Sequence, residues 1–129
     1  AKPYNLLGIP LLIIRDMLIS HKKTFKDISD SDERIAPSIL SARLKLLESI
    51  HLIFKTKTAE NKKENIYLLT DKGVELTPII IELTLWGDKW MREFNQIDSI
   101  DGLKTDKSII VKTTQDNYKN LVIEYRELF

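Results

Sequence analysis

Residues 37–69 contain the pattern that most restricts the fold of this chain. From Pro37 to Ile50 the apolar residues recur at helical spacing, and a proline suits the first turn of a helix. Residues 52–58 and 65–69 alternate between apolar and polar side chains around a charged loop, which is typical of a β-hairpin. The pattern therefore predicts a surface helix followed directly by a small antiparallel sheet.

The two faces of the segment 37–50 differ in chemistry. At about 100° per residue, with Ile39 as the origin, one face is apolar and predicts packing on a core. It carries Ile39, Leu40, Leu44, Leu46, Leu47 and Ile50. The opposite face is small and polar with one cation, and it carries Ser38, Ser41, Ala42, Lys45 and Ser49. We expect this second face to point outwards.

Two residues of this region have an expected structural role. Arg43 falls at about 40° on the apolar face, where a guanidinium needs a partner to offset its desolvation. Asp16 is the candidate partner, because it is the only acid on the first helical segment. His51 follows the helix and is expected to end it in the left-handed conformation, which histidine tolerates better than most residues.

Two helices are predicted before this segment. Residues 10–20 are apolar on nearly every side, which predicts a helix in the centre of the core. Thr24 can cap a short helix over residues 25–28. We therefore expect helix, short helix, helix and hairpin in this order.

The remainder of the chain is predicted to be mainly helical. Thr70 can cap a long segment from Asp71 to about Phe94, with a break near Thr77 and Pro78. Residues 95–107 read as a polar linker, residues 108–113 as a short strand, and residues 114–129 as a last helix.

The long segment has more apolar residues than one side of a helix can bury on a small core, which indicates a partner surface. We expect a homodimer interface formed by Leu76, Ile79, Ile80, Leu83, Trp86, Trp90, Met91 and Phe94.

The amino-acid composition excludes several classes of functional site. The 129 residues include no cysteine and two histidines, which excludes a disulfide framework and a thiolate zinc site and makes a histidine-rich metal site improbable. No nucleophile–base pair or glycine-rich phosphate loop is present, so we expect no enzyme, cofactor or metal. The longest apolar run, residues 9–14, is too short for a membrane span, and we expect a cytoplasmic protein.

Charge is unevenly distributed although the net charge is +1. Residues 34–63 contain seven cations and two carboxylates, whereas residues 64–129 contain eight cations and twelve carboxylates. The predicted surface helix and hairpin therefore lie in the basic part of the chain, which favours a polyanionic partner.

The motifs LLIIRDML, FKDIS, IAPSILSARLKLLES, YLLTDKGVEL and LWGDKW, between Leu11 and Trp90, resemble the HxlR-type winged helix-turn-helix regulators, relatives of the MarR group. The resemblance implies a mainly α fold with a small β-hairpin wing and additional C-terminal dimerisation helices. It also implies a homodimeric, sequence-specific DNA-binding transcriptional regulator, with the recognition helix 37–50 in the major groove and the wing 53–69 on the phosphate backbone of double-stranded DNA.

This interpretation assigns DNA contacts to nine residues. Ser38, Ser41, Ala42 and Lys45 are expected in the groove, Arg34 on a phosphate near the helix start, and Lys55, Lys57, Lys62 and Lys63 on phosphates from the wing. The alternatives are a solvated helix face and, for the whole module, dimerisation or protein docking without DNA binding.

We divide the chain into two parts. Residues 1–95 form the winged helix domain including its dimerisation helix. Residues 96–129 form the polar linker and a last helix that packs on the dimer interface or, as an alternative, lines a pocket for a small apolar effector.

Overall fold

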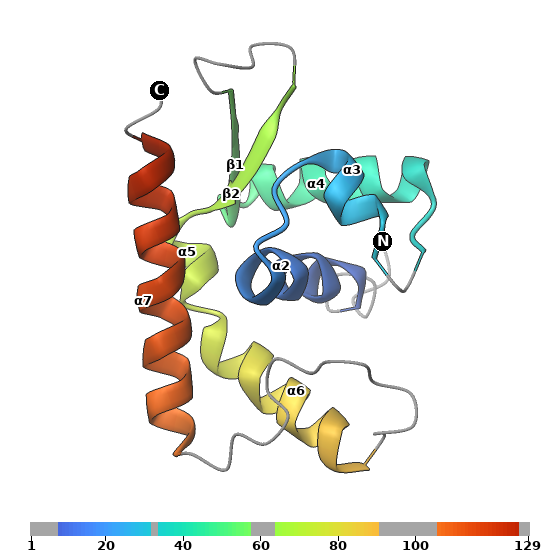
Figure 1. Cartoon of the computed structure of the whole chain (residues 1–129). Helices are drawn as coiled ribbons and strands as arrows, with labels where there is room; N and C mark the ends of the chain where they lie inside the picture. The colour runs from blue at the N-terminus through green and yellow to red at the C-terminus, as the bar shows by residue number, and fades with distance from the viewer. Residues whose placement is uncertain (1–7, 32–33, 58–63, 91–105, 127–129) are drawn as a thin grey trace.

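The computed structural model describes residues 8–31, 34–57, 64–90 and 106–126. Its elements are α2 (Ile9–Ser20), α3 (Phe25–Ser29), α4 (Pro37–Ser49), β1 (Ile53–Thr56), β2 (Ile66–Leu69), α5 (Asp71–Val74), α6 (Thr77–Trp90) and α7 (Lys107–Arg126). The hairpin projects from the opposite side of the molecule to α6, and α7 runs along one flank past both (Figure 1). The predicted class, mainly α with a β-hairpin wing, is confirmed.

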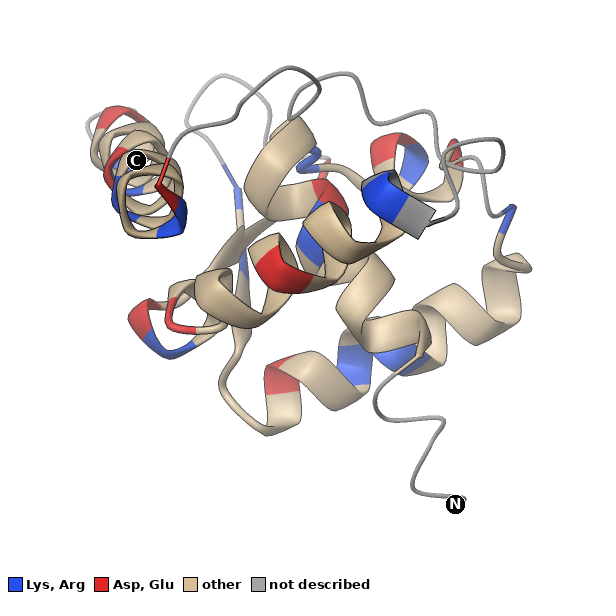
Figure 2. Ribbon diagram, turned by 90° about the horizontal axis from the view of Figure 1, so that it is seen from below, with Lys and Arg blue, Asp and Glu red and all other residues tan. Residues whose placement is uncertain are grey.

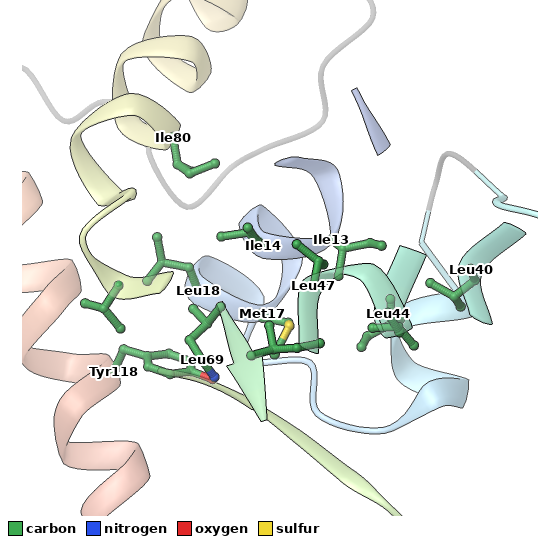
Figure 3. Packing of buried hydrophobic residues seen from close by; sticks show 13 residues of the cluster. Ile13, Ile14, Met17, Leu18, Leu40, Leu44, Leu47, Leu69, Ile80 and Tyr118 are labelled. Atoms are coloured by element: carbon green, nitrogen blue, oxygen red, sulfur yellow. The ribbon is translucent and has the colours of Figure 1, made fainter. Parts of the chain in front are cut away.

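Helix α2 is the centre of the core, as its all-round apolar sequence predicted. Its buried residues meet buried residues of α3, α4, the hairpin, α6 and α7 in one cluster (Figure 3). This cluster consists of Ile13, Ile14, Met17, Leu18, Ile28, Leu40, Leu44, Leu47, Ile53, Leu69, Val74, Ile80 and Tyr118. Burying these side chains is the main source of stability in a domain of this size.

The short helix α3 begins at a capping box. The hydroxyl of Thr24 accepts a hydrogen bond from the Asp27 N–H at 3.0 Å, and the Asp27 carboxylate accepts one from the Thr24 N–H at 3.3 Å. Two backbone donors that a helix start leaves unpaired are thus satisfied. The predicted cap at Thr24 is confirmed.

The hairpin is a two-stranded antiparallel sheet. Ile53 pairs with Leu69 at its base, and Thr56 pairs with Ile66 towards the loop. Ile53 and Leu69 are both buried, so the base of the wing belongs to the core. The wing is therefore anchored where it meets α4 and α5.

The long segment after the wing is broken between α5 and α6, as predicted near Thr77 and Pro78. The Thr70 hydroxyl accepts from the Gly73 N–H at 3.1 Å and caps α5. Gly73 packs so closely on the Leu52 carbonyl that a Cβ there would overlap with its oxygen. The glycine thus seats α5 against the joint between α4 and β1.

The prediction of a strand over residues 108–113 is wrong, because these residues form the first turns of α7. The Asp106 carboxylate accepts from the Ser108 N–H at 2.9 Å at the helix start. Thr114, the first residue of the predicted last helix, instead lies inside α7 and donates its hydroxyl to the Ile110 carbonyl at 2.8 Å. The β-branched residues there carry only a weak intrinsic preference, which the packing of a long helix overrides.

Candidate nucleic-acid interface

The outer face of α4 lies open on the surface. Ser38, Ala42 and Lys45 are exposed, and Ser41 is half-buried. Within the described part of the chain, Lys45 forms no ion pair. The four side chains predicted to face DNA therefore share a surface whose cation is available to a partner.

The core-facing side of α4 is rotated relative to the prediction. Leu40, Leu44 and Leu47 are buried, whereas Ile39 and Ile50 are 41% and 40% exposed. The buried residues centre at about 105° from Ile39, so Ile39 lies near the edge of the outer face. The prediction of both isoleucines as core residues is wrong, since it gave all apolar residues equal weight.

Arg43 does not pair with Asp16, and this prediction is wrong. The Asp16 carboxylate instead accepts from Arg15 at 2.9 Å and from Lys22 at 3.5 Å. Arg43 is half-buried, and its Nε is buried without a hydrogen-bond partner among the described residues. Arg15 within α2 and Lys22 just after it are closer in the chain and pair with the carboxylate. Arg43 is accordingly held against the protein rather than extended freely into solvent.

The joint between α4 and the wing is a tight backbone turn. His51 has a φ of 62°, as predicted for a left-handed terminator. The His51 N–H donates to the Glu48 carbonyl at 3.0 Å, and the Leu52 N–H donates to the Leu47 carbonyl at 3.0 Å. These two bonds form a Schellman motif, which ends a helix by pairing its last carbonyls. The turn fixes the direction in which the wing leaves α4.

The wing presents cations on its first strand. Lys55 in β1 and Lys57 directly after it are exposed, whereas Ile53 on the same face of the strand is buried at the base of the hairpin. Lys62 and Lys63 lie outside the described residues. Arg34 precedes α4, is exposed, and has a φ of 48°. The predicted phosphate-contacting cations that the structure describes are thus all on the surface.

Charge supports an anionic partner for the region of α4 and the wing. Residues 34–57 contain five cations and one carboxylate. Elsewhere acidic and basic residues alternate, and α7, seen nearly end-on beside the C-terminus in Figure 2, carries both kinds. The α4–wing surface is therefore the local concentration of positive charge.

The order of elements and this geometry agree with the match to a family model. Residues 10–95 match the model described as HxlR-like helix-turn-helix. The chain belongs to this family. Its resemblance to HxlR-type regulators, predicted from the motifs, is confirmed.

Two relatives of the HxlR-like chain support this family assignment. It is 31% identical to the HTH-type transcriptional regulator YodB of Bacillus subtilis (strain 168) over 60% of its own length and 70% of that protein. It is also 31% identical to the uncharacterized HTH-type transcriptional regulator YvaP of the same strain, over 57% of its length and 68% of that protein. These relatives bear the names of transcriptional regulators rather than of enzymes.

The solved structure of PA1607 has a TM-score of 0.59 and 30% identity and covers 74% of this chain. The match spans 65% of PA1607, slightly less than two thirds. The reduced form of YodB has a TM-score of 0.52 and 26% identity over 74% of this chain. The regulator SlyA, at 18% identity and a TM-score of 0.54, shares the fold. The winged helix fold of the HxlR-like chain is thus shared with known transcriptional regulators.

Helix α6 of the HxlR-like chain has an exposed apolar stripe. Ile79, Leu83 and Trp86 are 50%, 52% and 56% exposed, and Leu76 is half-buried. Ile80 is 2% exposed and belongs to the core of the single chain, so its prediction as an interface residue is wrong. The Trp90 side chain, Met91 and Phe94 lie outside the described side chains. Three predicted interface residues therefore remain available to a partner.

Sequence reasoning missed the contribution of α7 to the winged helix. Tyr118 is 0% exposed, and Ile109 and Ile123 are 55% and 54% exposed. Helical spacing indicated that this segment packs somewhere, but spacing does not identify the surface it packs on.

Within the described ranges, no group of His, Cys, Asp or Glu side chains is arranged to hold a metal, and no helix is long and apolar enough to cross a membrane.

Proposed function

We propose that this HxlR-like regulator is a homodimer that binds operator DNA. Helix α4 enters the major groove, and the wing lies on the phosphate backbone. The observation that carries the proposal is the open outer face of α4, where Ser38, Ala42 and Lys45 are exposed beside the exposed wing lysines. This is the arrangement by which winged helices bind duplex DNA.

The chemistry of the α4 face suits a groove. The major groove admits an α-helix, and small side chains let the helix backbone approach the base edges closely. Ser38 and Ala42 provide such side chains, and Lys45 provides a donor for guanine O6 or N7. Specificity is assigned to these residues, whereas Arg34, Lys55 and Lys57 supply phosphate contacts.

The α6 stripe supports the homodimer. An apolar stripe at positions 79, 83 and 86 runs along one side of the helix, and such a patch marks an interface on a small protein. A two-fold axis there would present two α4 helices to half-sites about one helical turn apart.

The proposal is tested by selecting duplexes from a random library and measuring affinity by fluorescence anisotropy at several salt concentrations. We expect enrichment of a two-fold symmetric site. Lys45→Ala should weaken binding to that site by about 1–3 kcal/mol, with little effect on unrelated duplexes. Lys112→Ala is the matched control, because Lys112 is an exposed lysine on α7, away from α4. Binding that is absent, or insensitive to salt, would favour a protein-docking module instead.

A further inference from the structure

A pocket of about 580 Å³ lies between α7 and the base of the hairpin. Its walls come from the end of α4, both strands, α5 and two turns of α7. The lining residues are His51, Phe54, Leu69, Thr70, Asp71, Lys72, Val74, Tyr118, Lys119, Val122, Ile123 and Arg126. This volume falls within the range of small-molecule sites in proteins.

The floor of the pocket is apolar. Val74 is buried, Phe54 and Val122 are half-buried, and Ile123 is 54% exposed at the opening. A ligand with a flat or branched hydrocarbon body would remove this apolar surface from water, which favours binding.

The rim of the pocket is cationic. Lys72, Lys119 and Arg126 line it, against the single carboxylate of Asp71. The Lys72 Nζ donates to the Ile50 carbonyl at 2.9 Å, which holds this ammonium beside the pocket. Lys119 and Arg126 are seven residues apart on α7 and therefore project on the same side. Neither forms an ion pair within the described residues, so the rim has uncompensated positive charge.

We propose that this pocket binds a small organic anion with an apolar body, of the aromatic carboxylate or sulfonate class. The apolar floor takes the hydrocarbon part, and the cations of α7 and α5 take the acidic group. A DNA phosphate would use the cations alone and would leave the apolar floor unoccupied, so a small amphipathic anion fits the pocket better.

The pocket also touches the joint that directs the wing. His51 ends α4, and Leu69 and Thr70 end the hairpin, with the Thr70 hydroxyl donating to the His51 carbonyl at 2.6 Å. A ligand wedged between this joint and α7 would favour one orientation of the wing relative to α4, and would thereby change DNA affinity. This regulatory part rests on the proposed function, whereas the binding part does not.

The binding test uses the full chain and the aromatic sulfonate 8-anilinonaphthalene-1-sulfonate, followed by its fluorescence. Ile123→Glu places a carboxylate at the mouth of the pocket, and Ile109→Glu makes the same change on α7 at a residue equally exposed but outside the pocket. We expect Ile123→Glu to weaken the probe by about tenfold or more, and Ile109→Glu to change it less than about twofold.

A second pair of variants tests the charge requirement. Lys119→Gln removes a rim cation and should weaken the probe about threefold or more, whereas Lys112→Gln on the same helix should not. Equal losses in the members of either pair, or no saturable binding to the folded wild-type chain, would overturn the site. Circular dichroism of each variant confirms that the helices are intact.

The regulatory part is measured separately. A saturating aromatic carboxylate, 1-naphthoate, should change the affinity of the wild-type chain for duplex DNA about fivefold or more, and should leave that of Ile123→Glu unchanged. Binding of the fluorescent probe without any binding of DNA would contradict the proposed function but would still support the pocket as a ligand site. DNA binding that 1-naphthoate does not alter, or alters equally in both proteins, would overturn the coupling alone.

Discussion

The phenol oxygen of Tyr118 in α7 accepts a hydrogen bond from the backbone N–H of Leu69, the last residue of β2, at 2.9 Å. Figure 3 shows the Tyr118 ring extending from α7 towards Leu69 within the core. The same ring lies in a T-shaped arrangement with His21, with ring centroids 6.1 Å apart. Helix α7 therefore joins the turn after α2 to the base of the wing, and its inner face is part of the winged helix core.

Tyr118→Phe removes the acceptor of a buried N–H and keeps the ring. A buried donor left without a partner costs about 1–3 kcal/mol, and we expect the free energy of unfolding to fall by this amount in urea titrations. Tyr125→Phe on the same helix is the matched control, because it keeps the ring that Lys23 Nζ contacts at 5.1 Å. The control should lose less than about 0.5 kcal/mol. Equal losses would show that the Tyr118 hydroxyl contributes nothing specific.

The same hydroxyl predicts a pH dependence. Burial raises the pKa of Tyr118 to about 12, above its usual value of 10.0. Below pH 10 the tyrosine is protonated in both states, and its contribution to stability is complete. As the pH rises from 10 towards 12, the unfolded chain ionises first and this stability is lost, by about 1.4 kcal/mol at pH 11. Tyr118→Phe should lack this loss when unfolding is compared at pH 9 and pH 11.

Much of the winged helix could be predicted from the sequence because local chemistry agrees with the fold. Three local predictions agree with the structure: the proline at the start of α4, the cap at Thr24 and the left-handed conformation of His51. The alternation of apolar and polar side chains predicted the hairpin, and the missing N–H of proline predicted the break before Pro78. The outward face of α4 followed from the helical period alone.

The failures share a physical cause, which is that tertiary contacts decide between alternatives with similar local preferences. Residues 108–113 favour a strand locally, yet α7 packs Ile110 and Tyr118 and continues through them. Asp16 pairs with Arg15 and Lys22, which are nearer in the chain than Arg43. A pocket lined by the last helix was one alternative from the sequence, but its position beside the wing could not be predicted, because its two walls are separated by about 50 residues of sequence.

Gly73→Ala is expected to destabilise the fold, although alanine usually stabilises a helix relative to glycine. The added Cβ would overlap with the Leu52 carbonyl oxygen, which also accepts the Thr70 N–H at 3.1 Å. Relieving the overlap must shift α5 from the α4–β1 joint, at a cost of about 1–3 kcal/mol. Differential scanning calorimetry measures the change, with Glu75→Ala, an exposed neighbour, as control. A melting temperature at or above that of the wild type would show that the joint accommodates the methyl group.

The wing lysines are expected to set the salt dependence of DNA binding. Lys55→Gln combined with Lys57→Gln should reduce the slope of log affinity against log salt by about two units if both ammonium groups contact phosphates. The matched control replaces Lys26 and Lys112, which are also exposed and lie outside α4 and the wing. Lys62 and Lys63, predicted to contribute in the same way, provide a second pair. An unchanged slope in the Lys55 and Lys57 variant would mean that these two wing lysines do not contact the phosphate backbone of the DNA.

The α6 stripe predicts the oligomeric state. Leu83 lies between Ile79 and Trp86 on one side of α6, and all three are at least 50% exposed in the single chain. Burying such side chains across a two-fold axis stabilises a dimer, and a carboxylate in its centre would be desolvated without a partner. We expect the wild type to sediment as a dimer at micromolar concentration and Leu83→Asp to sediment as a monomer with unchanged helix content.

Ile50→Asp is the control for this change, because Ile50 is 40% exposed at the end of α4, away from α6. It should remain a dimer. The Leu83→Asp monomer should also bind a selected symmetric duplex more weakly than the wild type does, because the two α4 helices are no longer held at a fixed spacing. A wild-type chain that sediments as a monomer would contradict the homodimer. A Leu83→Asp variant that stays dimeric would remove α6 from the interface and leave the exposed Ile109 and Ile123 of α7 as the surface to test next.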